Sequence, residues 1–131
     1  MKKVVIVGSA SLQENIQYRK KFREDKGYSI INYPAPIPEE NFLEEYPGIH
    51  TKFFKDITKT DILFVMNENK NDIIWYLGAE SFAEMCFGVG RNLIHNKNIE
   101  VILLQIPENK VQSYDEINLW LKLNWIKLLK E

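Results

Sequence analysis

A glutamate within an apolar helical segment is the side chain of this sequence best suited to covalent chemistry. Helical spacing over residues 79–90 gathers one apolar face, formed by Phe82, Met85, Cys86 and Val89. Glu84 points to the opposite side, where its neighbours Ala83 and Phe87 are also apolar. We therefore expect this side to be covered too, by a proline-rich loop or by a second subunit. A carboxylate in a partly dry cleft has a raised proton affinity and can act as a nucleophile or general base. A simply solvated Glu84 is the competing interpretation.

A second candidate is the turn Gly8-Ser9-Ala10-Ser11, which follows the first apolar run. Backbone N–H groups at a helix N-terminus attract phosphate or carboxylate groups. Residues 11–14, with Ser11 first and Glu14 last, match a capping box, so Ser11 is either an N-cap or a ligand contact. No capping role accounts for Ser9, and we interpret it as a functional residue.

The sequence contains no motif for nucleotide-binding loops, for a serine nucleophile or for a metal site. Neither glycine-rich nucleotide fingerprint occurs, and no Gly-x-Ser-x-Gly sequence accompanies the histidines. We expect His50 and His95 on the surface or in loops, and Cys86 as a small buried residue. With one cysteine and no paired histidines at ligand spacing, the chain predicts no metal site, no disulfide and no cofactor.

Apolar runs alternate with helical patterns along the chain. Strands are expected at 3–7, 28–32, 61–67 and 99–105, with helices starting at Ser11, near Ile49, after Gly78 and at Ser113. We expect Gly88-Val89-Gly90 to end the third helix, and the last helix to reach Leu128. Since every crossover can hold a helix, the pattern predicts a parallel sheet of order 2-1-3-4 with helices on both faces.

Ligands of such sheets bind at the strand carboxyl ends beside the topological switch point. Here these ends are the turn at Gly8, the segment from Asn67 to Glu80, and the proline-rich segment 33–47. We expect segment 33–47 to be an extended loop, either a surface connector or part of the site.

Length and charge limit the function classes. The 131 residues fit one domain, 1–131, and 17 Lys plus Arg against 18 Asp plus Glu leave no basic excess for nucleic acid. The apolar run Val4–Val7 is too short for a signal peptide or a membrane span. We therefore expect a cytoplasmic protein with no membrane or nucleic-acid partner.

Two segments resemble the nucleoside 2-deoxyribosyltransferase-like family. They are residues 56–67 (DITKTDILFVMN) and 76–90 (YLGAESFAEMCFGVG), and with the run Val4–Ser9 the similarity spans roughly residues 3–105. The resemblance implies a flavodoxin-like three-layer sandwich of four to five strands. It also implies that a carboxylate attacks the anomeric carbon of a deoxyribosyl group and releases the base.

The resemblance places Glu84 at the nucleophile position, with Asp56 near the substrate and Ser81 at a small hydroxyl position. Many members have an aspartate where this chain has Gly78 and its neighbours. The Ser9 turn is more similar to relatives that hydrolyse nucleoside monophosphates. The predicted catalytic residue is thus Glu84, and the predicted substrate-binding residues are Gly8, Ser9, Asp56, Asn67, Gly78 and Ser81.

The sequence supports two functions. The first is cleavage or transfer of the N-glycosidic bond of a deoxynucleoside or its 5′-monophosphate. The second is a non-catalytic nucleotide-binding or protein-interaction module on the same scaffold. The apolar helix at 79–90 and the pair Trp120 and Trp125, five residues apart, also predict a homo-oligomer, with one tryptophan facing the core and the other a partner.

Overall fold

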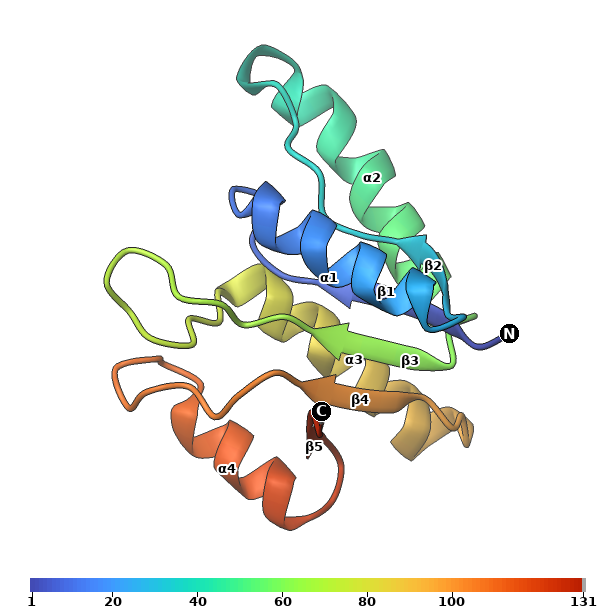
Figure 1. The fold of residues 1–131 in the computed structure, drawn as a ribbon, viewed down its shortest axis with the longest axis vertical. Coiled ribbons are helices and arrows are strands. Elements are labelled where there is room, and N and C mark those ends of the chain that lie inside the picture. Colours follow the sequence, from blue (N-terminus) through green and yellow to red (C-terminus); the bar gives the residue numbers. More distant parts are fainter. Residues whose placement is uncertain (131) are drawn as a thin grey trace.

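Five short parallel strands form one sheet at the centre of the computed structural model, which describes residues 1–130 (Figure 1). The strands are β1 (Lys3–Val7), β2 (Ser29–Asn32), β3 (Ile62–Val65), β4 (Glu100–Leu103) and β5 (Lys127–Leu128). Their order is β2-β1-β3-β4-β5, and each neighbouring pair is parallel. The predicted α/β architecture of flavodoxin-like type is therefore confirmed, with the order 2-1-3-4 extended by a fifth strand.

Four α-helices pack on this sheet. They are α1 (Gln13–Asp25), α2 (Phe42–Ile57), α3 (Ala79–His95) and α4 (Tyr114–Lys122), and a single 3-10 turn, η1 (Glu39–Asn41), precedes α2. No helix among residues 1–130 is both long and apolar enough to cross a membrane.

Side chains of the central strands alternate between two apolar layers because successive residues of a strand point to opposite faces. One layer joins Val5, Leu63 and Val101 to residues of α2, α3 and α4. The other joins Val4, Phe64 and their neighbours mainly to Ile16 of α1. Three helices therefore pack on one face of the sheet, and a single helix packs on the other.

Neither predicted serine cap forms. The helix α1 begins at Gln13, and the Ser11 hydroxyl contacts the Ser9 hydroxyl at 2.9 Å instead of a helical N–H group. Ser113 precedes α4 with φ −86° and ψ 8°, outside the extended conformation that directs an N-cap side chain toward the helix. Ser113 does occupy the N-cap position of α4, whereas Leu12 takes that of α1, and neither helix has a side-chain hydrogen bond at its N-cap.

Much of the segment 33–47 is helical, contrary to the prediction of a loop. Only residues 33–38 remain extended, and α2 contains Pro47. Proline removes the helical N–H that would bond the carbonyl of Leu43, whose residue is 88% exposed. Water can replace that donor, so the helix tolerates the proline at its exposed end.

The helix α3 also continues past the glycines that were expected to end it. A Cβ atom at Gly88 would lie 2.7 Å from Leu63 Cδ2, so glycine at this position permits close packing of α3 on β3. The helix ends instead at Asn96, which takes the left-handed conformation with φ 55°. Packing rather than termination therefore explains Gly88.

The C-terminal segment is shorter in helix than expected. After Lys122 the chain turns at Asn124, with φ 59°, and pairs residues 127–128 with β4. This turn places the rings of Trp120 and Trp125 5.9 Å apart, so the two tryptophans pack together rather than on opposite sides.

Candidate functional site

Two adjoining cavities open at the carboxyl ends of β1, β2 and β3, where the strand order reverses. The first, which we call the α2 cavity, has a volume of about 340 Å³ and lies between residues 32–37, α2 and the start of α3. The second, the Lys70 cavity, has about 250 Å³ and lies between residues 8–12, 66–70 and 76–81. Both are lined by Gly8, Ala10 and Glu80, so together they form one cleft at the switch point.

The Glu84 carboxylate lies in the wall of the α2 cavity. The residue is only 5% exposed, and no described residue donates a hydrogen bond or an ion pair to it. Burial, with a smaller contribution from the charge of Glu80, raises the pKa of Glu84 from 4.5 to about 8. The interpretation of Glu84 as a solvated side chain is therefore wrong.

The helical face predicted for α3 was rotated relative to the observed one. The buried residues are Ser81, Glu84, Met85, Gly88 and Val89. Phe82 turns toward α4 instead, where its ring stacks on Trp120 at 5.7 Å. Glu84 is thus on the side that faces the sheet and the cavity, rather than on an outer side.

A row of aromatic side chains forms another part of the wall of the α2 cavity. Phe42, Tyr46, His50 and Phe54 follow one another at helical spacing on α2, and neighbouring ring centroids are 5.1, 5.0 and 4.4 Å apart. The first three of these side chains line the cavity. His50 is therefore a half-buried helical residue beside the site, not the surface or loop residue that was expected. The arrangement offers flat, apolar surfaces with a phenol and an imidazole as polar groups.

Glu80 connects the two cavities electrostatically. It lines both of them, and the Glu80 carboxylate beside the Tyr46 hydroxyl, together with burial and the charge of Glu84, raises the pKa of that tyrosine. Tyr46 consequently keeps its proton well above neutral pH and remains a hydrogen-bond donor.

The Lys70 cavity is lined by hydroxyl groups, by the carboxylates of Glu68 and Glu80, and by the cation of Lys70. The ammonium group of Lys70 donates to Ser9 Oγ at 2.7 Å, and Ser9 Oγ is 2.9 Å from Ser11 Oγ. A two-residue turn, Asn71 and Asp72, has the positive φ angles of a type I′ turn and joins Lys70 to Ile73 by two backbone hydrogen bonds. The turn aims Lys70 back across the cavity toward the loop after β1.

Most predicted binding residues meet in this cavity. Its walls include Gly8, Ser9, Gly78 and Ser81. A side chain at residue 8 would come within 3.1 Å of the Met66 carbonyl oxygen, so glycine allows the close approach of the loops after β1 and β3. Glu84 lies in the adjoining α2 cavity.

Asn67 and Asp56 line neither cavity and have positioning roles instead. Asn67 donates to the carbonyl oxygens of Gln105 at 2.7 Å and Trp75 at 3.2 Å, and it accepts from the Gln105 N–H at 3.1 Å. Asp56 accepts from Asn32 at 2.8 Å and from Lys52 at 2.9 Å, and both of those residues line the α2 cavity. Asp56 thus acts on the cleft through its two partners.

Sequence reasoning missed Lys70, Tyr46 and the position of His50. The aromatic residues at 42, 46, 50 and 54 recur at four-residue intervals, which is a helical signal that the prolines of this segment obscured. Lys70 follows β3 at the strand end where ligands bind, but only the turn at residues 71–72 shows that its side chain points inward.

Within residues 1–130, no three His, Cys, Asp or Glu side chains lie close enough together to hold a metal ion. Comparison of the chain with protein-family models, with curated proteins and with solved structures gave no match.

Proposed function

We propose that the cleft cleaves or transfers the N-glycosidic bond of a deoxynucleoside or its 5′-monophosphate, with Glu84 as the nucleophile. The observation that carries this proposal is a buried carboxylate without a described protein partner in the α2 cavity, whose wall also contains a row of aromatic rings. The rings can stack on a planar base, and the carboxylate can meet the sugar attached to it.

In the first step, an oxygen of ionised Glu84 bonds to the anomeric carbon as the bond from that carbon to the base nitrogen breaks. The base leaves with the electron pair and takes a proton from a solvent water molecule, which becomes hydroxide. The Tyr46 hydroxyl lines this cavity and can donate a hydrogen bond to the departing base when it is not directed at Glu80. Water or a second base then attacks the same carbon and releases Glu84.

The raised pKa of Glu84 is compatible with this chemistry provided that the carboxyl group loses its proton before it attacks the sugar. At neutral pH the free carboxyl is mostly protonated, because its pKa is about 8. The transition state of glycosidic cleavage resembles an oxocarbenium ion, whose positive charge favours the ionised carboxylate. The rate should therefore increase as the pH rises toward the pKa of Glu84.

The protein is to be incubated with deoxynucleosides and their 5′-monophosphates, and free base measured by chromatography. We expect base release, lowered by about three orders of magnitude or more in Glu84→Gln, which keeps the shape of the side chain but removes the nucleophile. A Glu84→Gln variant that folds normally and retains the wild-type rate would exclude this mechanism.

The Lys70 cavity supplies a site for the 5′-phosphate in this proposal. The Lys70 ammonium and the Ser9 hydroxyl line this cavity and are donors that can meet phosphate oxygens. We expect Lys70→Met to weaken binding of the monophosphate by about 10- to 100-fold, with little effect on the nucleoside. Titration calorimetry of both ligands checks this, and equal losses for both ligands would place the phosphate elsewhere.

Protonated Glu84 also favours the second function, a nucleotide-binding module without turnover at neutral pH. This alternative predicts saturable nucleotide binding with no free base formed at any pH. The same chromatographic assay, run from pH 6 to about 9 to span the raised pKa, separates the two functions.

A further inference from the structure

The imidazole of His50 lines the α2 cavity, and no other residue of the described part of the chain, 1–130, forms a hydrogen bond or ion pair with it. Its ring packs between those of Tyr46 and Phe54, with centroids 5.0 and 4.4 Å away. The ring nitrogens are therefore open to a ligand in the cavity. Histidine is the side chain that most readily exchanges a proton near neutral pH.

Two contacts join α2 to α3, four residues before and four residues after His50. In the first, the Tyr46 hydroxyl lies beside the Glu80 carboxylate. In the second, the ring centroids of Phe54 and Phe87 are 4.8 Å apart. His50 thus lies midway along the stretch of α2 that packs against α3.

Glu84 lies between the two α3 residues of these contacts, so it stands at the same level as His50. No hydrogen bond or ion pair joins the two side chains within residues 1–130, although both line the α2 cavity. The cavity has a volume of about 340 Å³, within the range of about 300–1,000 Å³ of small-molecule sites. One bound ligand can therefore contact Glu84 and His50 at once.

The other ionisable side chains of the α2 cavity are less suited to give up a proton. Lys52 already forms an ion pair with Asp56 at 2.9 Å. Glu80 acts as a negative charge on its neighbours and raises the pKa of Tyr46. Tyr33 and Tyr46 are phenols, which are weaker acids than an imidazolium ion.

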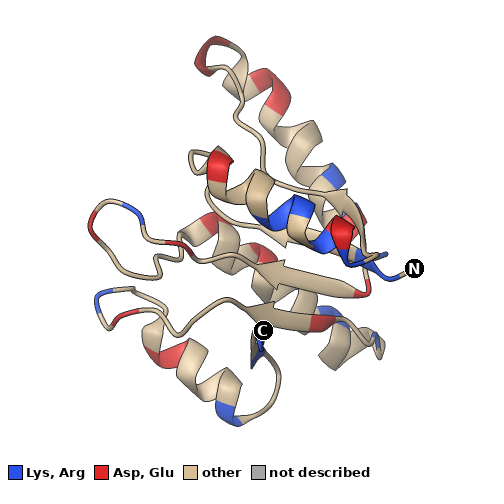
Figure 2. Ribbon diagram, viewed as in Figure 1, with Lys and Arg blue, Asp and Glu red and all other residues tan. Residues whose placement is uncertain are grey.

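The projecting end of α2 supplies no other cation. Residues 39–49, which we call the α2 tip, lie at one end of the molecule (Figure 1) and contain Glu39, Glu40, Glu44 and Glu45 (Figure 2). Between Gly27 and Thr51 the sequence has no Lys or Arg. His50 is therefore the single basic residue of the segment 28–50.

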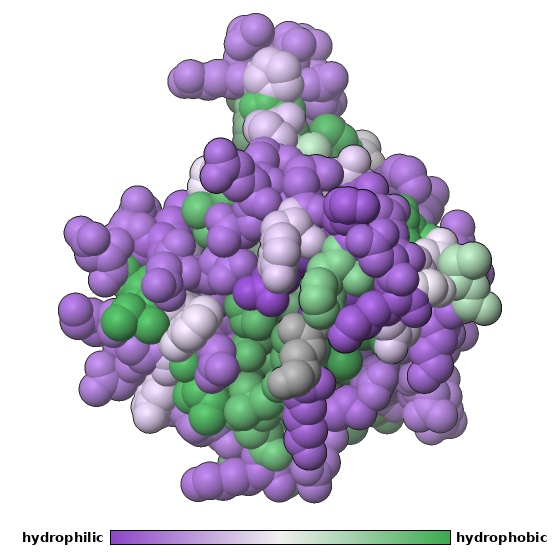
Figure 3. Space-filling model, in the orientation of Figure 1, coloured by the Kyte–Doolittle hydropathy of each residue, from purple (hydrophilic) through white to green (hydrophobic). Residues whose placement is uncertain are grey.

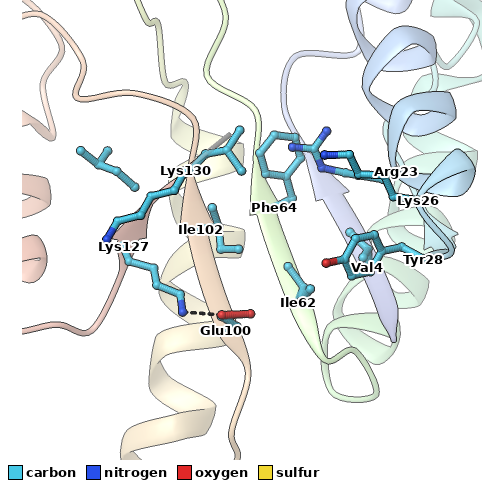
Figure 4. A pocket seen from close by; sticks show the side chains of 12 residues that line it. Val4, Arg23, Lys26, Tyr28, Ile62, Phe64, Glu100, Ile102, Lys127 and Lys130 are labelled. Atoms are coloured by element: carbon cyan, nitrogen blue, oxygen red, sulfur yellow. Dashed lines mark ion pairs between the residues drawn. The ribbon is translucent and has the colours of Figure 1, made fainter. Parts of the chain in front are cut away.

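The face of α1 offers no comparable group. Hydrophobic side chains appear on its surface below α1 (Figure 3), and a groove of about 340 Å³ lies there (Figure 4). Its floor is packed, since Val4 and Phe64 are each 1% exposed and the Arg23 guanidinium lies 3.9 Å from the centre of the Phe64 ring. Lys127 on its rim is paired with Glu100 (Figure 4). No histidine, serine or cysteine of residues 1–130 lines this groove.

We propose that His50 is the general acid of the cleavage and gives its proton to the departing base. This role rests on the function proposed above and replaces solvent water as the proton source. As the bond from the anomeric carbon to the base nitrogen breaks, the electron pair goes to the base, and the imidazolium proton passes to a nitrogen or oxygen of that base. Neutral imidazole remains, and no hydroxide forms.

The second step returns the proton. Water attacks the anomeric carbon, the bond from that carbon to the Glu84 oxygen breaks with its electron pair, and neutral His50 takes a proton from the water. The carboxylate and the imidazolium ion are then both restored.

Two leaving groups distinguish a proton donor from a structural residue. A deoxynucleoside 5′-monophosphate needs a proton at its base, whereas 4-nitrophenyl 2-deoxyriboside releases a phenolate that is stable without one. We expect His50→Phe, which keeps a flat ring between Tyr46 and Phe54, to lower kcat for base release by about 10²- to 10⁴-fold. Release of nitrophenolate should stay near the wild-type rate. Glu84→Gln should lose both reactions, because both use the nucleophile.

Two further variants serve as controls. His50→Gln, which keeps a polar side chain, should give the same pattern as His50→Phe. Phe54→Leu removes a ring that packs on the imidazole but no proton, so it should change both rates by the same factor. Added imidazole should restore part of the base release in His50→Ala and leave nitrophenolate release unchanged.

Equal losses on the two substrates in His50→Phe and His50→Gln with native circular dichroism, or unchanged base release, would overturn the role of His50 and leave the nucleophile Glu84 in place. A wild type that releases no base would overturn the proposed function and this role with it.

Discussion

The carboxyl group of Glu84 opposes folding when it is ionised. It is 5% exposed, it has no described partner, and burial raises its pKa to about 8. A residue placed for stability alone would be apolar or paired at this position. Its position in the wall of a cavity is the observation on which the proposed chemical role rests.

The pH dependence of stability should reveal this group. The folded state holds the Glu84 proton more tightly than the unfolded chain, so the free energy of unfolding decreases as the pH rises from 4.5 to about 8. We expect Glu84→Gln to be more stable than wild type at high pH, by a few kcal/mol at most, with the difference vanishing below the unfolded pKa. Chemical denaturation of both proteins across this pH range measures the difference.

Glu80→Gln is the matched comparison for that experiment. It removes the negative charge that adds to the raised pKa of Glu84 but leaves the burial unchanged. The pH window in which stability falls should therefore move to slightly lower pH. A flat difference between Glu84→Gln and wild type at all pH values would mean that Glu84 is solvated.

For the Glu84 side chain, the sequence predicted that it is covered but not which residues surround it. Four of the six predicted binding residues line the Lys70 cavity, and Glu84 lies in the neighbouring one. Asn67 was expected to contact substrate because it follows a strand, yet the carbonyls of Gln105 and Trp75 take both amide hydrogens. Which donors and acceptors a side chain meets depends on loops whose conformation short-range patterns do not determine.

The helix α3 depends on one glycine for its distance from the sheet. We expect Gly88→Ala to destabilise the protein by about 1–3 kcal/mol, because the new methyl group would press on buried Leu63. Gly90→Ala, two residues on in the same helix, has no atom within 4 Å of its Cβ and should stabilise by about 0.5–1 kcal/mol. Thermal denaturation of both variants compares them, and equal shifts would contradict the close packing.

These glycines also show why the helix boundaries were mispredicted. The pattern of Gly88 and Gly90 predicted a helix end because glycine weakens an isolated helix. In the folded chain, close packing on β3 and contacts further along α3 outweigh that local cost. The same applies to Pro47, whose effect is small because the carbonyl it leaves unbonded is in the exposed α2 tip.

The whole molecule follows the order that periodicity predicted. Four apolar runs became β1 to β4, since βαβ connections of this length allow few other arrangements. Periodicity did not locate the fifth strand, because it has two residues and follows the turn at Asn124. Long-range packing, not local pattern, defines that segment.

The rates of backbone amide hydrogen exchange should differ between the central strands and the exposed end of α2. The strands β1 and β3 lie inside the sheet, with Val5, Ile6, Leu63 and Val65 fully buried. We expect their amides to exchange only by global unfolding, whereas residues 39–46, at the exposed end of α2, exchange by local opening. Mass spectrometry of exchanged peptides measures both, and strong protection of residues 39–46 in dilute monomer would contradict this view.

The two outermost strands of the sheet are each poor templates for a foreign strand. β5 has only two residues and carries Lys127, while the register between β2 and β1 shifts at Val4 and Val5. Short length, a charged side chain and irregular pairing all hinder edge-to-edge aggregation. The chain can therefore expose both borders of its sheet to solvent and still resist amyloid-like pairing.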